Sequence, residues 1–411
     1  MIPELLTPPH ERVIVVTFNF DARPGHGSLV EDLVLALASQ GHKAIVLSLE
    51  TGAAGPHAIP SSNPLVDIRR VHAPSVTGRF PGIVRRLFTQ IHALSHAVQL
   101  RGMTPTRVVY FSPAFLSLGP VLLLARGRRH RPVVVLVQWD FFPIHQHEIG
   151  RLPRLAPRGL LKLLERAAIG LADTVLVMSP RNEEFLHRYH PRLRAHVAVQ
   201  PPWGGSASES LPDDGSEREE RFVVVFGGQL TAGRGVEDLL RAAQILNRRD
   251  VPANILVIGD GPHRERLVRQ AEGLALTNVS FVGRLPRNSY LELLRTASAG
   301  IAVTVGGVSI PSFPSKTVDY CRCGVPVIAC TEETSDFGEV IESQAGGLAC
   351  AAGDAPGLAS AIERLYKEWL DGDIAVRRGS SRRFFLQNLT SEQAASRVLA
   401  ARPTDRWKDQ R

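Results

Sequence analysis

The chain has 411 residues, 44% of them hydrophobic, and carries a formal net charge of +8 at pH 7. This length is enough for two domain-sized cores, and no apolar run approaches the ~18 residues that a membrane-spanning helix needs. The first residues, MIPELLTPPHERVIVV, place acids and prolines where a signal peptide would begin with basic residues. The sequence therefore predicts a soluble, cytoplasmic protein.

Charge is divided unevenly along the chain. Residues 1–200 hold 23 Lys and Arg against 13 Asp and Glu, a net charge of +10, whereas the remainder holds 25 against 27, a net of −2. An anionic lipid surface, an anionic acceptor molecule or nucleic acid would each suit the basic first half.

The first half predicts a parallel sheet. Its apolar, β-branched runs are strand candidates at residues 13–17, 44–49, 107–111, 133–138 and 174–178. A helical pattern at 28–39 follows the first run, so strands and helices alternate. Between that strand and that helix, NFDARPGHGSLVEDL carries Gly25 and Gly27 on either side of His26.

The segment RFPGIVRRLFTQIHALSHAVQLRG, residues 79–102, predicts a basic amphipathic helix. One face of this helix carries Ile83, Leu87, Ile91, Leu94 and Val98. Arg85 and Arg86 lie off that face, and ARGRRHRP at 125–132 adds further charge. Two interpretations stay open: contact with a membrane surface, or a helix packed on its own sheet with a solvated basic face.

Residues 201–221, PPWGGSASESLPDDGSEREER, have the composition of a linker. After them, strand candidates alternate with helical patterns at residues 222–226, 255–258, 279–282, 300–304, 325–329 and 347–351. Such alternation predicts a parallel sheet covered by helices on both faces. We therefore expect an α/β protein with two doubly wound domains, 1–203 and 204–384, and a tail at about 385–411 that packs back on the first.

Three loops at strand ends of the second half suit a phosphate group. FGGQLTAGRGVEDLL places two glycines and Arg234 before a helix, and VIGDGPHRERL turns sharply from strand to helix. In SIPSFPSKTVDYCRCGVPVI, Ser315 and Lys316 begin a short helix. Glycines let backbone N–H groups approach an anion, and helix N-termini and basic side chains favour its charge.

Asp319 follows Lys316 by about one helical turn, on roughly the same face. A carboxylate would repel a phosphate, so the hydroxyls of a ribose are its expected partners. The sequence lacks G-x-x-x-x-G-K-[ST] and lacks G-x-G-x-x-G after a first strand, which argues against ATP hydrolysis and NAD binding. A rigid turn without a ligand is the alternative for the Ser-Phe-Pro-Ser loop.

The stretch 222–366 resembles the donor half of glycosyltransferase family 4, retaining enzymes of the GT-B fold. GGQLTAGRGVEDLLRAA, VIGDGPHRERL, VSFVGRLPRNSYLELLRTA and PSKTVDYCRCGVPVIA follow one another in the family's order and spacing. The resemblance extends more loosely over residues 12–200. It implies two Rossmann-like domains that face each other across a cleft, and a nucleotide-sugar donor, expected to be a UDP- or GDP-sugar.

On the donor side, the family's Glu-x7-Glu motif falls on Pro311 and Asp319, so only the second acid is kept. Arg234 takes the place of the family's Lys, and Gln229 stands where many members have Arg. The resemblance implies that Arg234 and Lys316 are catalytic, because they stabilise the departing diphosphate. The residues that it implies for donor binding are Gly25, Gly27, Gly228, Gln229, Asp260, Gly261, Arg284, Phe313, Pro314, Ser315 and Asp319.

On the acceptor side, Asp140 stands just past the strand at 133–137 and resembles the family's strand-end residue near the transferred sugar. It is the third catalytic candidate. Trp139, Phe141 and Phe142 suit a stacking platform for a sugar ring about as well as they suit a core. The acceptor candidates are His26, Phe142, His145 and His147.

His145, His147 and Glu148 have a His-x-His-Glu spacing that suits a metal on a strand face. Contact with the acceptor and ordinary surface histidines are the alternatives. Transfer in the GT-B fold needs no metal because side chains and helix ends neutralise the phosphates. We therefore expect neither a metal nor another cofactor.

Together with these residues, the resemblance implies an enzyme that moves a sugar from a nucleotide-sugar to an acceptor hydroxyl with retention. The acceptor would be a glycan, a lipid-linked molecule or a small molecule, and the basic half would suit the inner face of a membrane. A GT-B-fold sugar-nucleotide 2-epimerase is one alternative, disfavoured by Pro311 in place of an acid. A nucleic-acid-binding protein is another, but the basic residues follow no recognisable binding module.

The four cysteines, Cys321, Cys323, Cys330 and Cys350, all lie in the second half. Their spacing matches no zinc or redox pattern, so the sequence predicts reduced, structural thiols.

Overall fold

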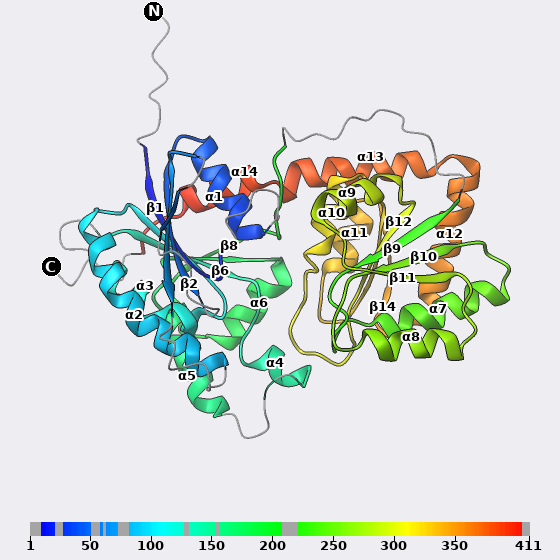
Figure 1. Ribbon diagram of the computed structural model, residues 1–411, viewed down its shortest axis with the longest axis horizontal. Coiled ribbons are helices and arrows are strands. Elements are labelled where there is room, and N and C mark those ends of the chain that lie inside the picture. The colour runs from blue at the N-terminus through cyan, green and yellow to red at the C-terminus, as the bar shows by residue number, and fades with distance from the viewer. Residues whose placement is uncertain are drawn as a thin grey trace, which may run out of the picture.

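The computed structural model describes residues 10–20, 28–50, 58–60, 63–72, 82–126, 131–150, 152, 157–207 and 221–404. These residues form two sheets, each with helices on both faces, in two domains that lie side by side (Figure 1). The α/β architecture predicted from the alternating pattern is therefore confirmed. The loop with Gly25, His26 and Gly27 lies outside the described residues, as does most of the predicted linker. None of the described helices is long and apolar enough to cross a membrane.

The sheet of the first domain has the strand order β3-β4-β2-β1-β5-β6-β7-β8 among the described residues. The strands are β1 (Arg12–Phe18), β2 (Lys43–Glu50), β3 (Ala58–Pro60), β4 (Val66–His72), β5 (Arg107–Phe111), β6 (Val133–Gln138), β7 (Thr174–Val177) and β8 (His196–Val199). The described pairings are parallel, except that β3 is antiparallel to β4. Strands such as β6, VVVLVQ, are almost wholly apolar because helices cover both faces of the sheet.

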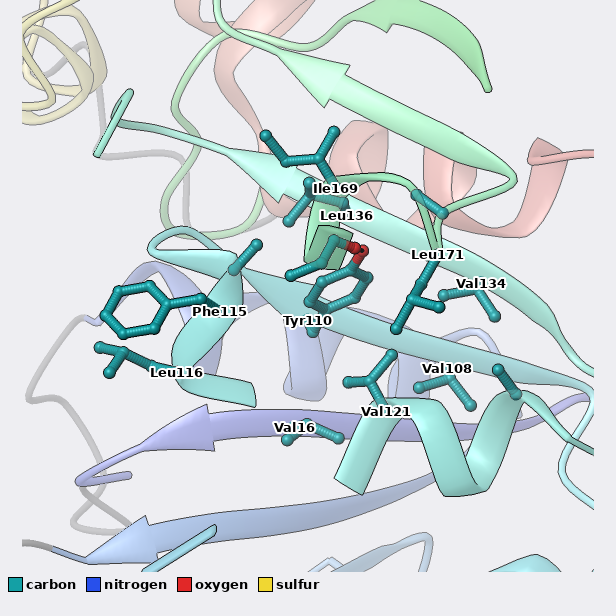
Figure 2. Packing of buried hydrophobic residues seen from close by; sticks show 14 of the residues in the cluster. Val16, Val108, Tyr110, Phe115, Leu116, Val121, Val134, Leu136, Ile169 and Leu171 are labelled. Atoms are coloured by element: carbon teal, nitrogen blue, oxygen red, sulfur yellow. Dashed lines mark hydrogen bonds between the residues drawn. The ribbon is translucent and has the colours of Figure 1, made fainter. Parts of the chain in front are cut away.

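The helices of the first domain pack against the sheet through two apolar clusters. They are α1 (Leu29–Ser39), α2 (Gly82–Gly102), η2 (Ala114–Ser117), α3 (Leu118–Ala125), α4 (Ile144–Glu148), α5 (Arg158–Ile169) and α6 (Pro180–Tyr189). Figure 2 shows Tyr110 of β5 among the side chains of the strands and of α3. The hydroxyl of this buried tyrosine donates to the carbonyl of Ala168 at 2.6 Å, which ties β5 to α5.

A buried carboxylate holds the turn that follows β5. Glu165 of α5 is fully buried, and its two oxygens accept the N–H groups of Ala114 and Phe115, each at 2.9 Å. Burial raises the pKa of Glu165 to about 7. The carboxyl group therefore satisfies the first N–H groups of η2, which have no partner within the turn itself.

Replacing Glu165 with alanine should lower the free energy of unfolding by roughly 2–6 kcal/mol, because each of two buried N–H groups left without a partner costs ~1–3 kcal/mol. The folded pKa lies above the ordinary value of 4.5, so protonation favours the folded state. The contribution of Glu165 therefore declines as pH rises from 4.5 through 7. Thermal unfolding across this range should show the wild-type Tm falling relative to that of Glu165→Gln; a constant difference would contradict the expectation.

The second sheet is parallel throughout its described pairings, in the order β11-β10-β9-β12-β13-β14. Its strands are β9 (Val223–Gly227), β10 (Asn254–Ile258), β11 (Val279–Gly283), β12 (Ala299–Val303), β13 (Val327–Thr331) and β14 (Leu348–Ala351). The helices between and after them are α7 (Val236–Arg248), α8 (Arg264–Gly273), α9 (Arg287–Thr296), α10 (Lys316–Arg322), α11 (Phe337–Gln344) and α12 (Ala355–Asp371).

The chain then returns to the first domain. Helix α13 (Ile374–Phe384), the short turn η3 (Phe385–Leu389) and α14 (Ser391–Ala400) run from the second sheet to the first, along one side of both domains (Figure 1). Ala394, Ala395 and Val398 of α14 are buried in the core that contains α1. The last helix therefore belongs to the packing of the first domain.

The prediction of four reduced cysteines is wrong for one pair. Cys330 of β13 and Cys350 of β14 are register partners in neighbouring strands, and their sulfur atoms are bonded at 2.07 Å. Cys321 and Cys323 are free and buried, and burial raises the pKa of Cys321 to about 12 and that of Cys323 to about 11. The spacing of the cysteines did not reveal the pair, because the contact depends on which strands are neighbours.

Candidate active site

Two adjoining cavities lie where the domains meet, beyond the carboxyl ends of the second sheet. The larger cavity measures about 700 Å³, and Leu29, Asp32 and Trp203 line it from the first domain. The smaller cavity measures about 310 Å³. The residues that line both are Leu29, Arg234, Pro314, Ser315 and Lys316. Ligands bind at this position in doubly wound sheets, so the two cavities form the candidate site.

Glycines bring the loops after β9 and β10 into direct backbone contact. A Cβ atom on Gly259 would lie 1.8 Å from the carbonyl oxygen of Gly228, and one on Gly261 would lie 2.4 Å from that of Leu230. Both glycines also have positive φ, at +140° and +155°. Side chains are thus excluded from this part of the wall, and the backbone itself borders the larger cavity.

Lys316 is the most unusual group of the site. Lys316 is half-buried, and its ammonium nitrogen is buried without a hydrogen-bond partner among the described residues. The nitrogen lies 3.8 Å from the ring centroid of Phe226. Burial, and then the charge of Arg234, hold the pKa of Lys316 well below its ordinary value. A buried ammonium group without an anionic partner is costly, so this arrangement calls for an anion in the cavity.

Arg234 brings a second positive charge to the wall that the two cavities share. It precedes Gly235, whose φ of +62° makes the turn into α7. A Cβ atom on Gly235 would lie 2.5 Å from the carbonyl oxygen of Thr304. The tight turn thereby places Arg234 directly before α7, and a basic residue next to a helix N-terminus favours a phosphate.

Asp319 lines the larger cavity, but its carboxylate is already engaged. Both of its oxygens accept hydrogen bonds from Arg287 of α9, each at 2.5 Å. The side chains of Arg287 and Asp319 are 21% and 17% exposed. The hydrogen bond and charge of Asp319 raise the pKa of Arg287 against the effect of burial. Contact between Asp319 and the hydroxyls of a ribose stays a prediction, and the structure adds that Arg287 accompanies Asp319 in the wall of the larger cavity.

Asp140 reaches the smaller cavity from the end of β6. Its backbone N–H donates to the hydroxyl of Ser112 at 3.0 Å, and its Oδ2 accepts from Gln146 at 3.0 Å. Trp139 lines the same cavity and stacks on Phe111, with ring centroids 4.8 Å apart. The first domain thus contributes an acid and an aromatic ring to the smaller cavity.

The other aromatic and histidine candidates lie in different places. Phe141 and Phe142 are buried in the first-domain core, where Phe142 stacks on Phe115 at 5.0 Å. Neither ring lines the two cavities, and contact between Phe142 and the acceptor stays a prediction. His145 lines the smaller cavity, whereas His147 does not. Among the described residues, no three His, Cys, Asp or Glu side chains come together as a metal site.

The structure gathers most of the predicted donor residues around the larger cavity. Those that line it are Gly228, Gln229, Arg234, Asp260, Gly261, Arg284, Pro314, Ser315, Lys316 and Asp319. Phe313 lines the smaller cavity instead. The residues that sequence reasoning missed are Asp32, Trp203, Arg287, Tyr290 and Glu332. Of these, Glu332 had a usable signal, because it is an acid immediately after a buried strand of the second sheet.

Comparison with known sequences finds a family match over much of the second domain. Residues 221–368 match the family described as "Glycosyl transferases group 1". The chain is 24% identical over 398 residues to a glycogen synthase of Mycobacterium tuberculosis, covering 93% of this chain and 91% of that protein. It is also 27% identical over 232 residues to a GDP-mannose-dependent alpha-(1-6)-phosphatidylinositol dimannoside mannosyltransferase of the same species, covering 56% of this chain and 52% of that protein.

Solved structures share the two-domain arrangement. Sucrose-phosphate synthase from Thermosynechococcus elongatus has a TM-score of 0.72 at 18% identity, over 95% of this chain and 97% of that one. WaaG, a glycosyltransferase involved in lipopolysaccharide biosynthesis, has a TM-score of 0.64 at 16% identity, over 95% and 100%. Anabaena HepE, solved with UDP and glucose, has a TM-score of 0.62 at 14% identity, over 96% and 100%. These similarities support the same overall fold.

Proposed function

We propose that this chain, a sugar-transferring enzyme of the GT-B fold, uses a UDP- or GDP-sugar as donor and transfers the sugar with retention, without a metal. The observation that carries the proposal is the buried ammonium nitrogen of Lys316, which has no hydrogen-bond partner among the described residues and lies with Arg234 at the junction of the two cavities. In this arrangement the nucleoside occupies the larger cavity and the diphosphate lies at the junction. The transferred sugar then extends into the smaller cavity.

The chemistry follows from where the two cations lie. The bond between the anomeric carbon and the diphosphate oxygen breaks, and a bond to the acceptor oxygen forms on the same face of the sugar. The acceptor's proton passes to the departing diphosphate. Negative charge grows on that diphosphate as the bond breaks, so Lys316 and Arg234 stabilise the transition state more than the ground state.

Titration calorimetry with UDP, GDP, ADP and dTDP and with their sugars tests the proposal. One nucleoside diphosphate should bind, and transfer from the corresponding sugar donor should persist in EDTA. NMR of the product should show the anomeric configuration of the donor. Absence of binding by every nucleotide would refute the donor site, and conversion of the donor to its epimer without an acceptor would favour a 2-epimerase.

We further propose that the first domain contacts an anionic membrane surface that carries the acceptor. Phe88, Ile91 and Val98 of α2 are 39%, 60% and 57% exposed, and Leu160 and Leu163 of α5 are 55% and 64% exposed. The inward face of α2 is formed instead by Ala93, Ala97 and Leu100. The apolar stripe predicted for residues 79–102 thus points partly to solvent, on the domain that bears the net charge of +10. The side chains of Arg85 and Arg86 lie outside the described residues.

Vesicle sedimentation should show binding to anionic vesicles that salt reverses, because each basic residue near the surface contributes ~1 kcal/mol within a Debye length. Ile91→Ser with Leu163→Ser should weaken this binding and leave nucleotide affinity unchanged. Leu370 and Val376 of the second domain are 56% and 74% exposed and serve as controls, so their serine variants should bind vesicles as the wild type does. Equal losses in both pairs, or no sedimentation at low salt, would contradict the membrane proposal.

A further inference from the structure

Glu332 is a buried acid in the wall of the smaller cavity. It follows directly after β13 and is 3% exposed. Its Oε1 accepts the N–H of Ser312 at 2.7 Å, and its Oε2 accepts the hydroxyl of Thr304 at 2.5 Å. The two hydrogen bonds of the Glu332 carboxylate therefore connect the end of β12 with the loop that precedes Lys316.

The position of Glu332 relative to the proposed diphosphate site determines which part of a bound donor Glu332 would contact. The two cavities join at Arg234 and Lys316, where the proposed diphosphate lies. In a nucleotide-sugar, the sugar is attached beyond the second phosphate. A donor held by those two cations therefore places its sugar in the smaller cavity, which Glu332 lines.

Among the described residues, the second domain contributes no other carboxylate to the lining of the smaller cavity. Between residues 310 and 316 the loop reads IPSFPSK, with no carboxylate. Asp140, the other carboxylate lining the smaller cavity among the described residues, belongs to the first domain. Glu332 is thus the acid on the donor side of the cavity.

The carboxylate of Glu332 keeps capacity for a ligand. An ionised carboxylate has about four lone-pair sites, and the contacts with Ser312 and Thr304 use two of them. The remaining sites suit the hydroxyl groups of a sugar, and their hydrogen bonds are strong because the acceptor is charged.

We propose that Glu332 accepts hydrogen bonds from hydroxyl groups of the donor's sugar and so selects hydroxyl-bearing sugars over deoxy-sugars. This inference rests on the proposed function and specifies the sugar end of the same site. A merely structural Glu332 would hold the loop around Ser312 and would not distinguish one sugar from another.

Glu332→Gln is the first test, because glutamine can still accept from the Ser312 N–H and can donate to the Thr304 hydroxyl. Affinity for the nucleoside diphosphate should stay within twofold of wild type in calorimetry. The value of kcat/KM for transfer should fall ~10- to 150-fold, the range for a lost hydrogen bond to a charged group. A fall in nucleotide affinity as large as the fall in transfer would reduce Glu332 to a support for the loop and overturn the inference.

Deoxy-donors separate a sugar contact from a structural role more sharply. Donors that each lack one sugar hydroxyl should be tested in turn. For at least one of them, the wild type should show a reduced kcat/KM, and Glu332→Gln should show no further reduction. Thr304→Val, which removes a support of the carboxylate but keeps the charge, should retain the wild-type discrimination. If Glu332→Gln does not fold, Glu332→Asp permits the same comparison, because it withdraws the charge by one methylene.

The outcomes distinguish this inference from the function on which it rests. A wild-type protein that binds no nucleotide and transfers no sugar would refute the proposed function. A wild-type protein that transfers sugar, with the same deoxy-donor penalties in every Glu332 variant, would refute the inference alone.

Discussion

Lys316→Met should remove most of the sugar transfer and, in the unliganded protein, raise the melting temperature. The transfer rate should fall ~10²- to 10³-fold, as for the loss of one preorganised donor to a developing anion. The gain in stability arises because methionine fills a similar volume without the cost of a buried ammonium group that has no partner among the described residues. Both effects follow from one feature, because in the proposed function the donor's diphosphate is the anion that stabilises the charge of Lys316.

Lys367→Met is a matched control. Lys367 lies on α12, its side chain is 67% exposed, and it pairs with Glu363. Its replacement should change neither transfer nor melting temperature appreciably, because exposed ion pairs contribute ~0–1 kcal/mol. Differential scanning fluorimetry and steady-state kinetics measure both variants. Wild-type turnover in Lys316→Met would remove Lys316 from the diphosphate site.

The pH dependence of donor binding gives an independent readout of Lys316. Its pKa is held well below 10.5 in the empty protein, and only the charged form pairs with a diphosphate. Affinity for the nucleoside diphosphate should therefore be present at low pH and lost as pH rises through the lowered pKa. Calorimetry at several pH values should show this loss in the wild type and a flatter profile in Lys316→Met.

Asp319→Ala should weaken nucleotide binding ~10- to 150-fold, corresponding to the ~1.5–3 kcal/mol of a hydrogen bond to a charged group. It should also destabilise the protein, because it leaves the guanidinium group of Arg287 largely buried and without its bidentate partner. The single substitution Asp319→Ala therefore changes nucleotide affinity and protein stability at the same time.

A double-mutant cycle separates the two effects. Arg287→Gln combined with Asp319→Asn removes both charges and leaves two amides that can bond to each other, so most of the stability should return. Nucleotide affinity should remain weak in the double variant if Asp319 contributes a charged acceptor to the ligand. Recovery of wild-type affinity together with stability would show that the Arg287–Asp319 pair only supports the wall of the cavity.

Much of the site was accessible from sequence because of a property of parallel sheets. Loops after successive strands of the second half meet at one edge of the sheet. The sequence therefore predicts that the glycine loops, Arg234 and Lys316 lie close together. The pattern could not predict how deeply each side chain is buried or which groups it contacts. The ammonium nitrogen of Lys316 lies against the ring of Phe226 without a hydrogen-bond partner among the described residues, and this depends on how α10 packs beside β9.

Three features could be predicted from the amino-acid sequence: the two α/β domains, the edge of the second sheet that carries the candidate site, and the basic character of the first half. They can be predicted because their signals are local or additive. Apolar periodicity and the glycines and prolines of turns are local signals, and net charge is a sum over residues. The tertiary structure alone decided the pairing of Asp319 with Arg287, the burial of Phe142, the Cys330–Cys350 bond and the place of Glu332. Each of these depends on which strands and helices become neighbours and in what register, and a linear pattern of residue types does not specify contacts between segments that are distant in the chain.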